Sequence, residues 1–423
     1  MITAVILLFI IGYLFIAFEH TIHINKAASA LITGVLCWTL YILYAPNKEE
    51  TVEHLTHHLG DISSILFFLL GAMTIVELID THAGFSVITD KIKTRSIYRL
   101  LWIVGLVTFI LSALLDNLTT AIVMTSLCGK LLSKKEDRIW FAGVIVIAAN
   151  AGGAFSPLGD VTTTMLWIGG QISAIKVITT LLLPSIFVTL VPLALVSHRF
   201  KKQQFTFASK VSADVSRGES LAVLILGVIL LLFVPVFKTI THLPPFMGVL
   251  LAVGIFWVFT SIIHRTKVSE RKERLSVTHA LQKIDSPSIL FFLGILLAVS
   301  ALQSFGILKQ LASILTDTIG NDYLIGTALG LISALVDNVP LVAAAQGMYT
   351  LEQYPPDHPF WHFLALSTGT GGSAIIIGSA AGVAAMGIEN INFIWYLKKI
   401  SWLALLGFVA GILVFLLQES MHF

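Results

Sequence analysis

The sequence predicts an all-α polytopic membrane protein built from two inverted-topology repeats. Each repeat is expected to have five membrane crossings, plus a re-entrant hairpin and a broken helix. Three observations lead to this prediction. The 423 residues are 56% hydrophobic and only 12% charged, which is far more apolar than a soluble domain requires. Apolar stretches of membrane-spanning length recur along the chain, and polar motifs of the first half return in the second.

The apolar stretches form two matching series of six. The first series covers 2–18, 27–45, 62–80, 99–132, 140–168 and 178–197, and the second covers 219–237, 244–263, 287–304, 322–350, 360–388 and 400–417. We therefore divide the chain into a first repeat, 1–218, and a second repeat, 219–423, with 198–218 as a polar link. The first stretch has no basic segment before it and no small-residue cleavage site, so we expect a retained span.

Three anchors align the two series at offsets between 219 and 224 residues. They are Leu66-Phe67-Phe68-Leu69 with Leu290-Phe291-Phe292-Leu293, Asp116-Asn117 with Asp337-Asn338, and Gly152-Gly153 with Gly371-Gly372. Matched polar interruptions in two halves are typical of secondary transporters with internal repeats, which bind their substrates near the bilayer midplane.

Basic residues predict the orientation of the segments. Four linkers, 80–99, 133–139, 198–218 and 264–286, hold 18 of the 26 lysines and arginines. Cytoplasmic loops are rich in these residues, so we place these linkers, together with Lys26, Lys398 and Lys399, on the cytoplasmic side. Both termini are then expected on the opposite side.

Two of the apolar stretches are predicted to be re-entrant hairpins. Residues 99–132 are too long for one crossing and have basic clusters at both flanks, so the hairpin should enter and leave from the cytoplasm, with Asp116-Asn117 at its tip. Residues 322–350 have acidic flanks, which predicts a hairpin from the other side with Asp337-Asn338 at its tip. Five crossings, an odd number, would turn the second repeat upside down.

The two stretches that follow are predicted to be broken helices, 140–168 and 360–388. Glycines and Pro157 interrupt the first, and such a break frees main-chain carbonyls. Asp160 lies beside that break, and no aspartate follows the matching glycines Gly371-Gly372. Carboxylates inside hydrocarbon are costly and usually functional.

These motifs predict a cation and proton site rich in oxygen atoms, the ligands that hard cations prefer. The residues expected to bind or orient the ions are Asp116, Asn117, Asp337, Asn338, Asn150, Ser156, Asp160, Thr162, Thr163, Ser112, Ser333, Thr368 and Ser373. We expect Asp116, Asp337 and Asp160 to hold Na⁺, and no lysine or arginine at the centre. A carboxylate in low dielectric readily takes up a proton, so cation and proton should compete, and activity should rise with pH.

Four strings carry a family resemblance: VELIDTHAGF (76–85), SALLDNLTTAIVM (112–124), ANAGGAFSPLGDVTTTMLW (149–167) and SALVDN (333–338). They resemble the NhaD-type Na⁺/H⁺ antiporters, part of a superfamily with arsenite and dicarboxylate carriers. The resemblance implies exchange of Na⁺ or Li⁺ for H⁺ across a bacterial inner membrane, without a cofactor. It also implies a homodimer, with the hairpins and broken helices as the moving part. The dicarboxylate carriers' hairpin tips resemble Ser-Asn-Thr; here aspartates replace that serine.

Several alternatives stay open. Asp160 is also a suitable helix cap, and Ser112 and Ser333 also suit close helix packing. Glu77, Asp80 and His82 suit either a hydrated helix end or a role in proton access or pH sensing. His54, His57 and His58 favour an exposed acidic loop over a metal site.

Other functions compete with cation exchange. An arsenite or organic-anion carrier is one alternative, although the tip aspartates would repel a dicarboxylate. An intramembrane aspartyl protease is remote, because its Gly-x-Gly-Asp motif would need glycine at Pro157. An ion-binding sensor is a third. No basic motif suggests a nucleic-acid partner, and an enzyme is not expected.

Overall fold

The computed structural model describes residues 2–89, 94, 96–201, 216–265, 267 and 269–421. Its regular elements within these residues are all helical, as the sequence predicts. Among the described residues, eight helices are long and apolar enough to cross a membrane. They are α3 (Lys26–Tyr44), α4 (Lys48–Thr81), α6 (Ile97–Leu114), α10 (Ala174–Ser197), α11 (Arg217–Thr241), α12 (Pro245–Ile263), α15 (Ser286–Ser304) and α22 (Ser401–Met421).

The remaining helices fall outside this group of eight. Those that build the interrupted segments are α7 (Asn117–Leu131), α8 (Lys135–Ala154), α9 (Val161–Ile168), α17 (Asp322–Ile332), α18 (Asn338–Met348), α19 (Pro359–Gly371) and α20 (Ala380–Glu389). The others are α1 (Ile2–Ala17), α2 (Glu19–Ile22), α5 (Gly84–Thr89), α13 (Ser269–Arg274), α14 (Val277–Lys283), α16 (Ile307–Ile319) and α21 (Phe393–Lys399), with two short 3₁₀ turns, η1 (His198–Phe200) and η2 (Gly372–Ala374).

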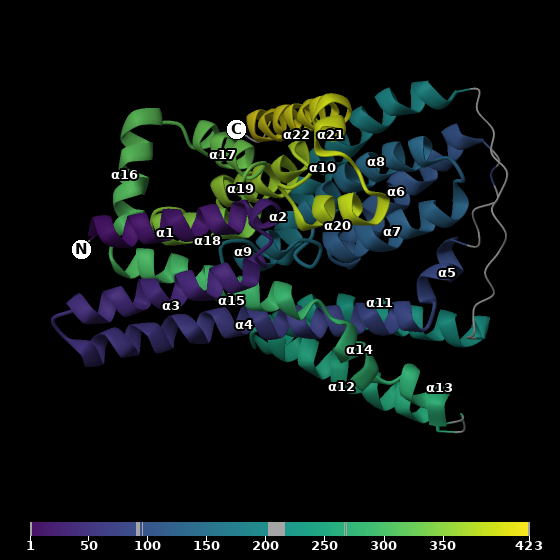
Figure 1. The fold of residues 1–423 in the computed structure, drawn as a ribbon, viewed down its shortest axis with the longest axis horizontal. Coiled ribbons are helices and arrows are strands. Elements are labelled where there is room, and N and C mark those ends of the chain that lie inside the picture. The colour runs from purple at the N-terminus through teal and green to yellow at the C-terminus, as the bar shows by residue number, and fades with distance from the viewer. Residues whose placement is uncertain are drawn as a thin grey trace.

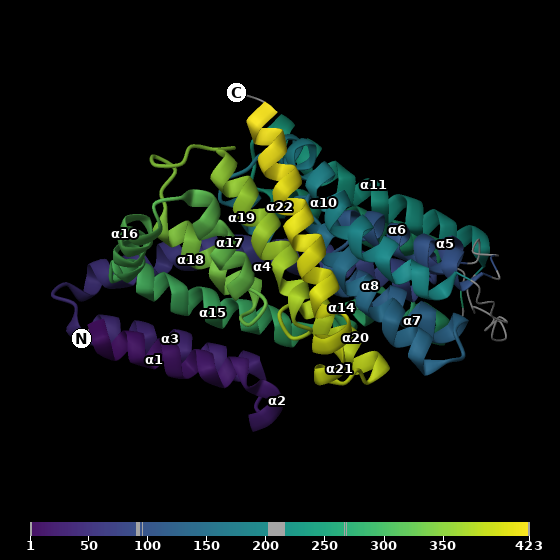
Figure 2. The ribbon, with the colours of Figure 1, turned by 90° about the horizontal axis from the view of Figure 1, so that it is seen from above.

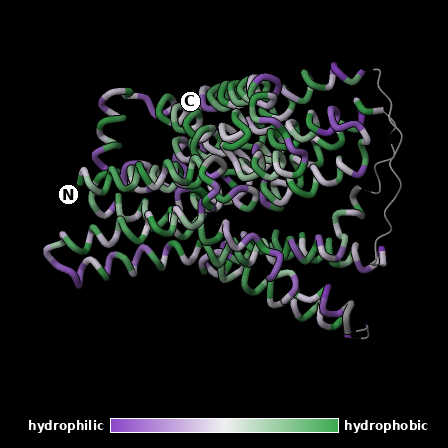
Figure 3. Tube along the Cα trace, viewed as in Figure 1, coloured by the Kyte–Doolittle hydropathy of each residue, from purple (hydrophilic) through white to green (hydrophobic). Residues whose placement is uncertain are grey.

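Hydrophilic residues gather toward the ends of the molecule. The turn between α3 and α4 lies with α16 at one end, and α5 and α13 lie at the other (Figure 1). Along the long helices between these ends the chain is mostly hydrophobic (Figure 3). This distribution suits helices that cross an apolar slab with their connections in water.

The helices of the two halves pack in matching pairs. Helix α1 lies on α3, and α11 lies on α12. Helix α3 packs along α15, and α4 packs along α12, while α10 packs against α22. In the same way α6 lies against α8, and α17 lies against α19.

Both predicted hairpins are interrupted at their Asp-Asn pairs. Helix α6 ends at Leu114 and α7 begins at Asn117, while α17 ends at Ile332 and α18 begins at Asn338. The open end of the α6–α7 pair faces the end of the molecule that carries α5, and the open end of α17–α18 faces the end that carries α16 (Figures 1 and 2). The tips therefore point toward each other across the interior.

One segment predicted as an exposed loop is helical. His54, His57 and His58 belong to α4, so the expectation of an exposed loop there is wrong. The side chain of Asn47 accepts hydrogen bonds from the first N–H groups of α4, and acidic residues fill its first turn, which stabilises this polar start. His57 is exposed and pairs with Asp61 one turn later. Residues between the predicted stretches 287–304 and 322–350 also form a helix, α16.

Candidate functional site

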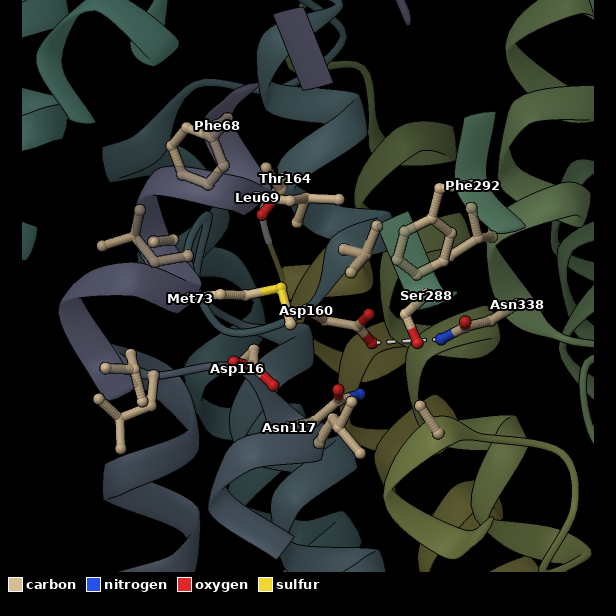
Figure 4. Close-up of a pocket in the computed structure, with 18 of the residues that line it drawn as sticks. Phe68, Leu69, Met73, Asp116, Asn117, Asp160, Thr164, Ser288, Phe292 and Asn338 are labelled. Carbon is tan, nitrogen blue, oxygen red and sulfur yellow. Dashed lines mark hydrogen bonds between the residues drawn. The ribbon is translucent and has the colours of Figure 1, made fainter. Parts of the chain in front are cut away.

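One cavity in the interior collects the two hairpin tips and the break between α8 and α9. Its polar lining includes Asp116, Asn117, Asp160, Asp337 and Asn338. Apolar side chains from α4 and α15 cover it on another side (Figure 4). Five of the residues expected to bind ions, including all three predicted Na⁺ ligands, thus line one space although they lie up to 222 positions apart in the chain.

Asp116 caps the N-terminus of α7. Its Oδ1 accepts a hydrogen bond of 2.7 Å from the main-chain N–H of Thr119, and its Oδ2 accepts one of 2.7 Å from the Thr119 hydroxyl. Aspartate is a favoured N-cap because its carboxylate satisfies N–H groups at the positive end of the helix. The cap holds the carboxylate at the hairpin tip, beside the cavity.

Asp160 caps α9 at the break and is 1% exposed. Its Oδ1 accepts from the N–H of Thr162 at 3.2 Å, and its Oδ2 accepts from Nδ2 of Asn338 at 3.3 Å (Figure 4). The cap that the sequence allowed is therefore present, and the same carboxylate also reaches the hairpin of the other half. One side chain connects the broken helix of the first half with the tip of the second.

Asp337 caps α18 and has a cationic partner. Its Oδ1 accepts from the N–H of Val339 at 3.3 Å, and its Oδ2 lies 3.4 Å from Nζ of Lys26. Lys26 also lies 4.4 Å from the centre of the Phe291 ring. The expectation of a centre without lysine is therefore wrong. Helix α1 ends at Ala17, and α3 begins at Lys26, so the chain turns back beside the cavity, where Lys26 is part of the lining.

A chain of amides and hydroxyls lies behind the first tip. Nδ2 of Asn117 donates to Oδ1 of Asn150 at 3.1 Å, and Nδ2 of Asn150 donates to the hydroxyls of Ser373 and Ser379 at 2.8 and 2.9 Å. Ser379 was missing from the predicted set. It caps α20 and lies 219 residues after Asp160, so the repeat offset alone would have found it.

Three of the other predicted residues, Ser112, Ser156 and Ser333, tie the hairpins to the broken helices instead of lining the cavity. Ser112 donates to the carbonyl of Ala149 at 2.5 Å, and Ser333 donates to that of Thr368 at 3.0 Å. Ser156 donates to the carbonyl of Ala113 at 2.5 Å. The hydroxyl of Thr163 lies 3.4 Å from the Ala154 carbonyl, and that of Thr368 bonds within its own helix. These side chains are buried.

The three residues predicted for proton access or pH sensing, Glu77, Asp80 and His82, lie in two different environments. Met73 and Val76 line the cavity, and Glu77 and Asp80 follow them by four residues on the same helix face. Glu77 lies 3.6 Å from Nζ of Lys283. His82 is fully buried and contacts His264 and Leu78.

The fold and the site together define a polytopic helical membrane protein with a carboxylate-lined cavity between two interrupted helix pairs. The chain belongs to the citrate transporter family, whose model matches residues 6–369. Its fold is similar to the YdaH transporter of Alcanivorax borkumensis, with a TM-score of 0.56 and 13% identity over 90% of both chains.

Its relatives include proteins named for cation exchange. Sodium/proton antiporter 2 of Arabidopsis thaliana is 46% identical over 97% of this chain and 98% of its own length. Sodium/proton antiporter 1 of the same plant is 49% identical over 99% of this chain and 73% of its own length. The Na⁺/H⁺ antiporter NhaD of Vibrio cholerae is 30% identical over 99% of this chain and 92% of its own length. The resemblance to NhaD-type antiporters is confirmed.

Proposed function

We propose that the protein is a secondary active transporter that exchanges Na⁺ for H⁺ across its membrane. The observation that carries this proposal is the cavity with three carboxylates, Asp116, Asp160 and Asp337, and one ammonium group, that of Lys26. With all four groups charged, the side chains contribute a net charge of about −2, which attracts a cation and repels a multivalent anion. Relatives named as Na⁺/H⁺ antiporters support the same function.

The proposed mechanism is competition between Na⁺ and H⁺ for the carboxylates. Na⁺ binds the ionised oxygens of Asp116, Asp160 and Asp337, and protons neutralise the same groups when Na⁺ leaves. Lys26 acts as an internal cation that holds Asp337 when the site is empty. Asn338 orients the Asp160 carboxylate through its hydrogen bond, while Asn117 and Asn150 bond each other and hold the first tip in place. The supporting main chain is fixed by the hydroxyls of Ser112, Ser156, Ser333, Thr163 and Thr368. The Thr162 N–H bonds Asp160, and the Ser373 hydroxyl accepts from Asn150.

Alternating access is the proposed transport step. The matching helix pairs and the opposed hairpins support two inverted repeats, 1–218 and 219–423, around a common site. The hairpins and broken helices would move together, because the serines and amides bind them to one another. Glu77 and Asp80, on the helix face that continues from the cavity, are proposed to pass protons toward the basic end of the molecule.

The experiment is H⁺ flux in proteoliposomes after a jump in Na⁺ concentration. Wild-type protein should release H⁺ on addition of Na⁺, and the Na⁺ concentration for half-maximal rate should fall as pH rises. Asp116→Asn, Asp160→Asn and Asp337→Asn should each abolish most of the exchange. The exposed Asp61→Asn on α4 is the matched control and should behave as wild type. Full exchange by both Asp116→Asn and Asp337→Asn would contradict the proposal.

The alternative function is transport of an organic anion, which the description of the family model favours. Uptake of labelled citrate or succinate by the same proteoliposomes distinguishes the two functions. We expect no uptake above empty liposomes, because the excess of carboxylates repels these anions. Anion uptake that disappears in Lys26→Met would establish the alternative instead.

Three finer points extend the proposal. Li⁺ is expected to substitute for Na⁺, and Li⁺-driven H⁺ flux tests this. A homodimer is expected from the family resemblance, and chemical cross-linking in native membranes tests it. A bacterial inner membrane with both termini on the non-cytoplasmic side stays a prediction, because the two most similar of the relatives given above are plant proteins. Terminal fluorescent fusions test the orientation.

A further inference from the structure

A second cluster of metal-ligating side chains lies away from the carboxylate cavity, where α4, α11 and α12 meet. It consists of His82 after α4, Glu219 in the first turn of α11, and His264 after α12. One ligand atom from each residue lies within 4.8 Å of the others. Nε2 of His82 is 3.1 Å from Nε2 of His264, which is 3.0 Å from Oε1 of Glu219.

We propose that His82, Glu219 and His264 form a binding site for a transition-metal dication of the Zn²⁺ type. Two imidazole nitrogens and one carboxylate oxygen are a ligand set that Zn²⁺ takes, with a fourth position left for water. Ligand atoms about 2.1 Å from a tetrahedral Zn²⁺ are about 3.4 Å apart. The two shorter separations in the cluster fall within a few tenths of an ångström of that value.

The surroundings of His82 prepare it for this role. Its Nδ1 lies 2.7 Å from the carbonyl of Leu78, which must accept, so Nδ1 carries the proton and Nε2 presents its lone pair to the cluster. The hydroxyl of Ser220 donates to the main-chain carbonyl of His82 at 2.7 Å and holds the segment against α11.

The ammonium group of Lys267 would compete with a metal ion for the Glu219 carboxylate. Its Nζ contacts Oε1 of Glu219, the same oxygen that faces His264. A dication would therefore have to displace the ammonium group from the carboxylate. This gives the site a signature that a simple hydrogen-bonded histidine pair lacks: removal of the lysine charge should strengthen metal binding.

The experiment is titration of the full-length protein, purified without a polyhistidine tag, with ZnCl₂ by calorimetry and with CoCl₂ by visible absorption. Wild type should bind about one Zn²⁺ per chain, and Zn²⁺ should displace Co²⁺ with loss of the tetrahedral absorption bands. His264→Ala and Glu219→Gln should each weaken binding at least about tenfold. Lys267→Met should strengthen it by up to about fivefold, the effect of one ion pair.

The control is His198→Ala. His198 is exposed, and its Nδ1 lies 2.7 Å from the carbonyl of Ala194, outside the cluster. It should bind Zn²⁺ as wild type does. Absence of saturable binding to wild type, or unchanged affinity in both His264→Ala and Glu219→Gln, would overturn the proposal. If those variants misfold by circular dichroism, Lys267→Met decides: unchanged or weaker binding contradicts the site.

Discussion

Asp116 and Asp337 occupy the same point of the two hairpins, yet different groups hold them. Asp116 receives two hydrogen bonds from Thr119 of its own helix. The residue that corresponds to Thr119 in the second half is Pro340, which has neither a hydroxyl nor an N–H to donate. Asp337 pairs instead with Lys26, which comes from α3 in the other half.

The two broken helices also carry different polar groups at matching positions. Asp160 caps α9, and Ser379 caps α20 at the matching position. Asn150 corresponds to Gly369 at the offset of the glycine pairs. A Cβ at Gly369 would lie 3.3 Å from Oδ2 of Asp160, so a larger side chain there would crowd the carboxylate. Helix caps thus lie at matching positions of the two halves, while the charged groups at these positions differ.

Replacement of the Asp160 cap by serine should have the largest effect. Asp160→Ser gives the first half the cap of the second, and we expect the rate of Na⁺-driven H⁺ flux to fall at least about 100-fold, because a charged partner is removed from a desolvated site. Ser379→Ala is the control on the other half and should keep most of the activity. Similar losses in the two variants would show that the halves are chemically equal.

Substitutions at the close contacts between hairpins and broken helices should lower the stability by similar amounts in both halves. A Cβ on Gly152 would lie 2.2 Å from the carbonyl oxygen of Phe109, and one on Gly371 would lie 2.0 Å from that of Gly330. Gly152→Ala and Gly371→Ala should each destabilise the protein by about 1–3 kcal/mol or more in thermal denaturation. Gly254→Ala has no atom within 4 Å of the new Cβ and should cost nothing. A loss in only one half would contradict equivalent packing.

Removal of Lys26 should tighten Na⁺ binding. Lys26→Met frees Asp337 from its internal cation, so we expect the Na⁺ concentration for half-maximal flux to fall by about 3- to 10-fold, as for loss of a competing partly buried charge. In an Asp337→Asn background the substitution should have no such effect. Lys238→Met, whose ammonium group donates to the carbonyl of Trp167 outside the cavity lining, is the control. An unchanged or higher Na⁺ requirement would show that Lys26 does not compete.

The smallest effect is expected from Thr119. Thr119→Val keeps the side-chain shape and the main-chain N–H but removes the hydroxyl that bonds Asp116. The ionised carboxylate loses one hydrogen bond, about 0.5–1.5 kcal/mol, so the apparent Na⁺ affinity should fall about 2- to 10-fold. Thr179→Val, whose exposed hydroxyl bonds only carbonyls of its own helix turn, should match wild type in the same flux assay.

Much of the site was visible in the sequence because its residues interrupt apolar stretches. The Asp-Asn pairs and the breaks of 140–168 and 360–388 were located from composition and repeat offset, and the structure has helix ends at each of them. The position of Lys26 in the cavity lining could not be predicted, because a lysine between two apolar spans resembles any cytoplasmic loop residue. The cluster of His82, Glu219 and His264 could not be predicted either, because no local pattern marks His264 or Glu219. The three residues come together only where three helices meet.

Hydropathy and charge pattern by themselves determined that this chain is a polytopic helical membrane protein with a duplicated polar motif, since apolar length and buried carboxylates leave local marks in a sequence. The tertiary structure alone decided which of those polar groups share one cavity, that Lys26 faces Asp337, and that Asp160 reaches Asn338. Contacts between distant segments depend on where short helices stop and turn back, and that is fixed by packing, which no local pattern records.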